Sequence, residues 1–111
     1  MLKKSLIPAI LANNKKQLIA KIDQIEDFVE SIQVDFTDGK FARPKTQFTS
    51  QDLYKLNPQP SVEAHLMIEN PEKTINDWIM AGAEKIILHT EAKMDWQKIL
   101  QIYQENFIKL Y

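Results

Sequence analysis

Ser31-Ile-Gln-Val-Asp-Phe-Thr-Asp-Gly39 is the stretch that decides the fold. Apolar and polar residues alternate along it, and successive side chains of a strand point to opposite faces of a sheet. The apolar set predicts a face packed against helices, and the polar set predicts the opposite face. The polar set consists of Gln33, Asp35 and Thr37. An aspartate inside a strand is unfavourable and costly to desolvate, so Asp35 needs a partner, a metal ion or a catalytic task. A strand end where Asp35 meets water or caps the next turn explains the stretch equally well.

Strands and helices are expected to alternate on both sides of this stretch. Strands are expected at residues 6–11, 31–37, 61–67, 85–89 and 107–111. Helices are expected after a cap at Asn13 or Asn14, from a cap at Ser50, from Pro71 behind Asn70, and from Asp95. This alternation predicts an α/β protein with a parallel sheet and crossover helices. No linker or low-complexity segment interrupts it, so residues 1–111 are expected to form a single domain.

The composition excludes several functional classes. The chain has 111 residues, no cysteine and a formal net charge of −1, which suggests neither nucleic acid nor an anionic membrane as a partner and excludes disulfides. A cytoplasmic location fits these features. The basic, apolar start could also be a short signal peptide, but Pro8 interrupts its apolar run and favours a strand. With only Gly39 and Gly82, the chain lacks Rossmann and P-loop fingerprints.

Titratable side chains recur on one predicted face of the sheet, towards the carboxyl ends of the strands. That face carries Gln33, Asp35, Thr37, Glu63, His65, Met67, Lys85, Ile87 and His89. Ligands of parallel α/β sheets bind at this end. On adjacent strands, Asp35 and His65 could hold a divalent metal ion or act as a proton-transfer pair. His89 could line the same opening or have a structural role.

Several segments resemble the ribulose-phosphate 3-epimerase family in order and spacing. They are Pro8-Ala-Ile-Leu11, Val34-Asp35 with Asp38-Gly39, His65-Leu-Met-Ile-Glu-Asn-Pro71, Ala81-Gly-Ala83 and His89-Thr-Glu-Ala92. The resemblance implies parallel (β/α) units of a TIM barrel. It also implies inversion at C3 of a pentulose phosphate, D-ribulose 5-phosphate to D-xylulose 5-phosphate, a step of the pentose phosphate pathway in carbohydrate metabolism. The family uses a divalent metal ion, and two aspartates act as acid and base.

The resemblance also assigns roles to individual residues. Asp35 matches a catalytic aspartate that is also a metal ligand, and His65 matches a metal ligand in the substrate site. Met67 matches a methionine that lines the site. Gln33 stands where the family has a metal-binding histidine, and a neutral amide oxygen suits hard cations better than zinc. Ala9 stands at the position of a substrate-binding serine.

Two further positions depart from the family pattern. Thr37 replaces a methionine of the site, and Glu63 stands where the family often has an aspartate. An inward-facing acid is thus kept at position 63 and could compensate for these departures.

The length predicts about half of a ribulose-phosphate-binding barrel, with four βα units and a fifth strand. A complete barrel needs about 250 residues and eight strands. The family's second aspartate and phosphate-binding loops lie in the other half, so we expect little activity from this chain alone. Two open sheet edges favour a homo-oligomer or association with a second half-barrel, besides a sugar phosphate as the small-molecule partner. The alternatives are a related phosphosugar lyase or decarboxylase barrel, and a non-catalytic half-barrel that acts by association.

Overall fold

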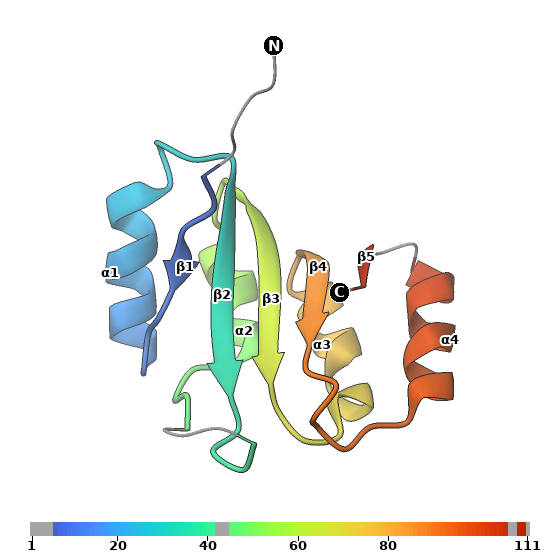
Figure 1. Cartoon of the computed structure of the whole chain (residues 1–111). Coiled ribbons are helices and arrows are strands. Elements are labelled where there is room, and N and C mark those ends of the chain that lie inside the picture. Colours follow the sequence, from blue (N-terminus) through green and yellow to red (C-terminus); the bar gives the residue numbers. More distant parts are fainter. Residues whose placement is uncertain (1–5, 42–44, 107–108, 111) are drawn as a thin grey trace.

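The computed structural model describes residues 6–41, 45–106 and 109–110, in which strands and helices alternate (Figure 1). The elements are β1 (Ala9–Ile10), α1 (Lys15–Ile25), β2 (Ser31–Thr37), α2 (Ser50–Leu56), β3 (Ser61–Met67), the 3-10 helix η1 (Pro71–Lys73), α3 (Ile75–Met80), β4 (Ala83–Leu88), α4 (Trp96–Asn106) and β5 (Lys109–Leu110). The strands form one sheet in the order β1-β2-β3-β4-β5, and every neighbouring pair is parallel. The expected α/β fold, half of a TIM-type barrel, is confirmed.

The register of the sheet places the predicted polar residues in rows. Gln33 pairs with Glu63, and Glu63 pairs with Lys85. One step nearer the carboxyl ends, Asp35 pairs with His65. Since paired residues of parallel strands point to the same face, these side chains share one side of the sheet, as the alternation predicted.

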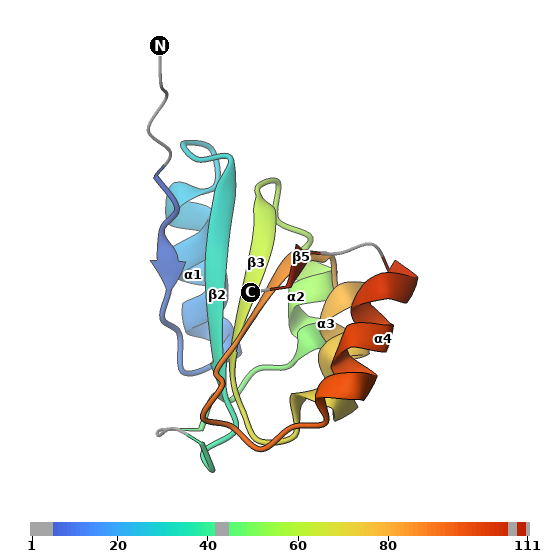
Figure 2. The same cartoon turned by 45° about the vertical axis from the view of Figure 1, so that its right-hand side comes forward.

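The other face of the sheet holds the hydrophobic core. Figure 2 shows the helices gathered along one side of the curved sheet. The fully buried side chains come from both layers: Leu18, Ile22, Ile32, Val34, Leu53, Leu66, Ile75, Ile86 and Ile99. The ring of Phe36 packs against Phe48 and Trp78, with centroid distances of 5.9 and 5.0 Å. The buried core therefore leaves the polar face of the sheet free for a site.

Side-chain caps begin the first two helices. The Asn14 side chain accepts a hydrogen bond from the backbone N–H of Gln17, which confirms one of the two predicted caps of α1. The cap of α2 is Thr49 rather than Ser50, because Thr49 and Asp52 form a reciprocal capping box. Ser50 is instead the first helical residue.

The predicted first strand is too long. Only Ala9 and Ile10 pair with β2, and Leu6 and Leu11 are 79% and 62% exposed. The physical reason is that β1 lies at the edge of the sheet, where the described chain supplies no further neighbour to cover these side chains.

The cap predicted at Asn70 is confirmed in position, with Pro71 as the first helical residue, but not in its side-chain hydrogen bond. Asn70 has a φ of 50° and makes no side-chain cap, and the residues after it form η1 before α3 begins at Ile75. The strand predicted at 85–89 is found at Ala83–Leu88, so it begins two residues earlier and ends one residue earlier than predicted. Of the predicted strand at 107–111, Lys109 and Leu110 pair with β4, and the other three residues lie outside the described part.

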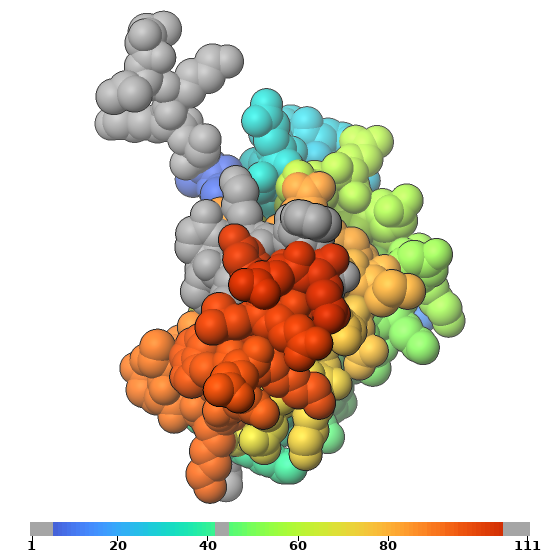
Figure 3. Space-filling model, turned by 90° about the vertical axis from the view of Figure 1, so that its right-hand side faces the viewer, coloured from blue at the N-terminus to red at the C-terminus, as the bar shows by residue number. Residues whose placement is uncertain are grey.

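Helix α4 carries apolar side chains on two faces. Ile99 and Ile102 are buried against the core, whereas Trp96, Leu100 and Tyr103 are 45%, 48% and 37% exposed. Figure 3 shows α4 at the surface of the molecule on the side facing the viewer. The helix predicted to start at Asp95 therefore buries only one of its two apolar faces. No helix in the described residues is long and apolar enough to span a bilayer.

Candidate functional site

Three polar side chains of β2 and β3 converge on the open face of the sheet. Gln33 Nε2 lies 3.1 Å from Asp35 Oδ1 and 3.4 Å from His65 Nδ1, and the last two atoms are 3.0 Å apart. The strand period brings Gln33 and Asp35 to one face, and the register places His65 opposite Asp35. We call these three groups the donor triad. Asp35 and His65 are largely buried, with side-chain exposures of 13% and 19%.

The separations within the donor triad are those of hydrogen bonds, and they also fall in the range between neighbouring ligands of one metal ion. Around an ion with ligand distances of about 2.1 Å, neighbouring ligands lie about 3.0 Å apart in octahedral and about 3.4 Å apart in tetrahedral geometry. The three separations, from 3.0 to 3.4 Å, span this range. Turning the Gln33 amide by 180° exchanges Nε2 for Oε1 and makes the triad two oxygens and one nitrogen.

The donor triad depends on that amide. No group of three or more histidine, cysteine, aspartate or glutamate side chains within residues 6–41, 45–106 and 109–110 is arranged to hold a metal ion. Asp35 and His65 therefore need Gln33, or a ligand outside these residues, to complete a coordination set.

A second histidine extends the site from β3 to the loop after β4. His89 Nε2 lies 2.7 Å from His65 Nε2, and their ring centroids are 4.8 Å apart. On its far side, His89 Nδ1 faces Glu91 Oε2 at 3.8 Å, and the ring of Phe41 lies 5.2 Å away. A line of polar groups thus runs from Asp35 through two imidazoles to an exposed carboxylate.

Beneath the donor triad lies an ion pair. Glu63 Oε1 is 2.8 Å from Lys85 Nζ, and their side chains are 11% and 26% exposed. Because the Glu63 carboxylate is bound to Lys85, it does not join the donor triad. The expectation that Glu63 could compensate for the glutamine at position 33 finds no support in this arrangement.

The loops that surround the site are tied together by carboxylates. Asp38 Oδ1 accepts hydrogen bonds from the backbone N–H groups of Lys40 and Phe41, and Oδ2 accepts one from Glu69. Glu69 Oε2 in turn accepts a hydrogen bond from the backbone N–H of Lys93. We call Asp38, Glu69 and Lys93 the rim brace, because they join the loops after β2, β3 and β4.

The electrostatics of Asp38 follow from these bonds. Partial burial works to raise the pKa of the Asp38 carboxyl, but the three backbone N–H groups and the charge of Lys40 outweigh burial and hold the pKa below its ordinary value. The carboxylate that organises the rim is therefore ionised at neutral pH.

The remaining predicted site residues surround the donor triad in the sheet. Ala9 pairs with Gln33 and is exposed, and Met67 pairs with Thr37 and is half-buried. Thr37 donates its backbone N–H to Thr46 Oγ1, which anchors the loop behind it. These residues form neighbouring positions on the same face, and none of them supplies an atom to the triad.

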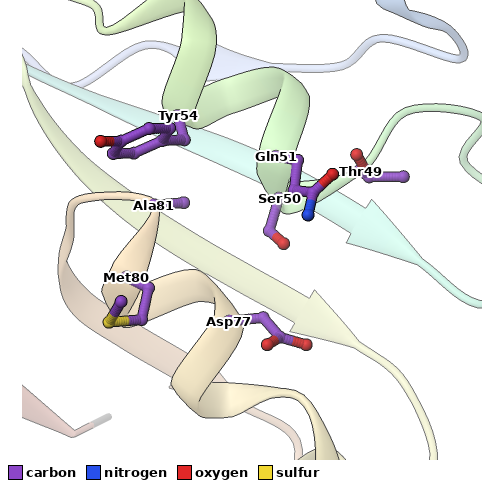
Figure 4. A pocket seen from close by; sticks show the side chains of 7 residues that line it. All are labelled: Thr49, Ser50, Gln51, Tyr54, Asp77, Met80 and Ala81. Carbon is purple, nitrogen blue, oxygen red and sulfur yellow. The ribbon is translucent and has the colours of Figure 1, made fainter.

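A cavity of about 510 Å³ lies away from this face, between α2 and α3 (Figure 4). Thr49, Tyr54, Asp77 and Met80 contribute to its lining. It is open to the helix side of the sheet and contains none of the donor triad, so its position offers no chemistry that involves Asp35 or His65.

Reasoning from the sequence missed the rim brace. Asp38 and Glu69 stand out in the sequence only as members of segments that resemble the family, and Lys93 belongs to no such segment. An Asp-Gly turn directly after a strand that carries acidic residues is the one signal that could have drawn attention to Asp38, because aspartate accepts hydrogen bonds from backbone groups in such turns.

Comparisons with known proteins point to one family. A model of the family described as "Ribulose-phosphate 3 epimerase family" matches residues 5–109. A ribulose-phosphate 3-epimerase of Candida glabrata is 28% identical over 98% of this chain and 52% of its own length. One of Aquifex aeolicus is 32% identical over 92% of this chain and 47% of its own length. The chain thus spans about half the length of these relatives.

A solved structure agrees in fold. The orotidine 5'-monophosphate decarboxylase of Methanocaldococcus jannaschii superposes with a TM-score of 0.67 over 96% of this chain and 52% of its own. At 14% sequence identity, this likeness concerns the fold alone.

Proposed function

This chain belongs to the ribulose-phosphate 3-epimerase family, and on that premise we propose that its donor triad serves the metal-assisted inversion of C3 in a pentulose phosphate. The reaction would interconvert D-ribulose 5-phosphate and D-xylulose 5-phosphate. The observation that supports the proposal best is the triangle of donor atoms, with sides of 3.0, 3.1 and 3.4 Å, in which Asp35 and His65 lie towards the carboxyl ends of β2 and β3. Active sites of parallel barrels lie at this end.

The roles of the side chains follow from their chemistry. Gln33, Asp35 and His65 would hold a divalent ion, whose charge would stabilise the negative charge that develops on the oxygen atoms beside C3. Asp35 would take the C3 proton, because a carboxylate can act as a general base on a C–H bond next to a carbonyl group. Since Gln33 is neutral, Asp35 supplies the one negative charge of the triad. The two oxygen ligands of the triad, one from Asp35 and one from Gln33, favour hard cations such as Mg²⁺ or Mn²⁺.

Inversion requires a proton carrier on each face of the substrate. In the described part of the chain, Asp35 is the one acid in the triad, and Glu63 is held by Lys85. We therefore propose that residues 1–111 act as a partial barrel domain and that a second half-barrel, either another copy or another chain, supplies the acid for the opposite face.

Exchange of the C3 hydrogen in D₂O separates the two proton transfers. The chain, supplied with Mg²⁺ and ribulose 5-phosphate, is expected to exchange this hydrogen slowly and with retention of configuration, because one acid removes and returns the proton on one face. Asp35→Asn should abolish the exchange, whereas Asp77→Asn, on the exposed helix side, should leave it unchanged. Epimerisation by the chain alone at the rate of full-length relatives would contradict the one-acid proposal, and exchange by Asp35→Asn would contradict the role of Asp35.

Metal titration by calorimetry tests the triad separately from catalysis. Asp35→Asn is expected to lower the affinity for Mg²⁺ and Zn²⁺ at least tenfold, because it removes the charge of the site. Gln33→His should raise the affinity for Zn²⁺ and not for Mg²⁺, since imidazole suits zinc and hard cations prefer oxygen. Equal metal affinity in the wild type and in Asp35→Asn would rule out the triad as the binding site.

A further inference from the structure

His89 lies next to the donor triad, and neither the alternation of the strands nor the resemblance to the family assigns a role to it. Its Nε2 atom lies 2.7 Å from His65 Nε2, a distance at which the two ring nitrogens are joined by a hydrogen bond rather than by face-to-face packing. The centroid distance of 4.8 Å and the interplanar angle of 29° fit a bond close to the planes of both rings. His65 therefore uses one nitrogen towards the triad and the other towards His89.

The proton pattern along this line is restricted. One proton fits between the two Nε2 atoms, so one ring donates and the other accepts. A metal ion at His65 Nδ1 needs the lone pair of that nitrogen, so the proton of a neutral His65 ring must lie on Nε2. His65 Nε2 then donates the hydrogen bond, and His89 Nε2 accepts it. His89 must then carry its own proton on Nδ1, the atom that faces Glu91 Oε2 at 3.8 Å.

The surroundings hold the His89 ring in the orientation that this pattern requires. Phe41 lies against it with a centroid distance of 5.2 Å and an interplanar angle of 46°. The backbone C=O of His89 accepts a hydrogen bond from the N–H of Ala92, which fixes the turn after β4. The side chain of His89 is about one-third exposed, so the ring that carries the accepting Nε2 atom is only partly buried.

We propose that His89 is a positioning residue, which holds the ring of His65 through the Nε2–Nε2 hydrogen bond so that Nδ1 faces Asp35 and Gln33. In the metal-free chain this Nδ1 donates to the Asp35 carboxylate, and when an ion binds it offers its lone pair to that ion. Hydrogen-bond partners of this kind orient ligand histidines in metal sites, and their loss typically weakens metal binding about 10- to 100-fold. The inference rests on the proposed function in one respect, namely that the triad receives a metal ion. The hydrogen bond itself is a property of the metal-free chain.

Two measurements on the full chain test the proposal. The chain has only two histidines, so NMR of the ¹⁵N-labelled protein shows four ring nitrogens to assign. At pH 8, a nitrogen–nitrogen coupling between the two Nε2 atoms is expected before metal is added. With Zn²⁺ bound, the proton should be attached to Nε2 of His65. In calorimetry with Zn²⁺ alone, His89→Ala should bind about 10- to 100-fold more weakly than the wild type.

The variants separate positioning from folding. His89→Gln, whose amide oxygen can accept the same hydrogen bond, should recover most of the lost affinity. The matched control Glu84→Gln, at an exposed position of β4 outside the site, should change the affinity less than about twofold. Absence of the coupling, or a His89→Ala affinity equal to that of the wild type, would overturn the proposal. A wild-type chain that binds no Zn²⁺ would overturn the metal site of the proposed function, while the coupling would still decide whether His89 holds the ring.

Discussion

Replacing Lys85 by methionine should destabilise the chain strongly, because it leaves a buried carboxylate without its counter-charge. Glu63 is only 8% exposed, and its Oε1 lies 2.8 Å from Lys85 Nζ. Methionine keeps the length and apolar stem of lysine, so the variant removes the charge with little change in packing.

The size of the effect follows from burial. Removing one partner of a buried ion pair costs about 3–5 kcal/mol, and the partial exposure of Lys85 places this pair at the lower end, about 3 kcal/mol. Domains of this size have a free energy of unfolding of about 5–15 kcal/mol, so a loss of about 3 kcal/mol is a substantial fraction of the stability of the chain. The double variant Glu63→Gln/Lys85→Met should recover about 2 kcal/mol, because no uncompensated charge remains.

Urea unfolding followed by circular dichroism measures these differences. With a denaturant slope of about 1.5 kcal/mol/M, Lys85→Met should lower the midpoint by about 2 M. Lys16→Met, at an exposed position of α1, is the matched control and should shift it little. A midpoint for Lys85→Met within error of the wild type would refute the reasoning, as would a double variant that is no more stable than Lys85→Met.

Two further predictions concern the loop after β2. Asp38→Ala should cost about 2 kcal/mol at neutral pH, since it removes three hydrogen bonds to an ionised carboxylate. Because the pKa of Asp38 is lowered in the folded chain, the stability that its carboxylate contributes is present above about pH 4 and is lost at lower pH. The urea midpoints of the wild type and Asp38→Ala should therefore converge on acidification. A constant difference between the two midpoints down to pH 2 would contradict this prediction. Gly39→Ala should cost about 2 kcal/mol, because φ is 78° and a Cβ atom would lie 2.9 Å from Lys45 Cβ. Gly82→Ala, with φ of 106° but open space around the new Cβ atom, should reduce the stability in thermal unfolding less than Gly39→Ala does. An equal loss of stability in the two variants would show that the contact with Lys45 is not the cause of the loss in Gly39→Ala.

Much of the central sheet could be predicted from the sequence because its signals are local. The alternation in β2 and β3 specifies which side chains face the helices, and the bounds 31–37 and 61–67 were found as predicted. The first helix begins at a cap that its own sequence encodes in Asn14.

Other features depend on groups far apart in the chain. The exposure of Leu6 and Leu11 follows from the position of β1 at the sheet edge, which no pattern within residues 6–11 records. The contact between His65 and His89 joins residues 24 positions apart through the direction of two rings, and the alternation of polar and apolar residues carries no information on ring orientation. The prediction could therefore place both histidines near the same opening but could not choose between a structural and a functional role for His89.

The order of the strands in the sheet also has a consequence for how the chain folds. Strand order equals sequence order from β1 to β5, so each strand pairs only with its predecessor and its successor. Assembly can start from the long β2–β3 pair and spread outwards, without bringing distant ends of the chain together. Local opening should run in the reverse direction, so backbone amides of β2 and β3 should exchange with solvent deuterium last, and those of β1 should exchange first.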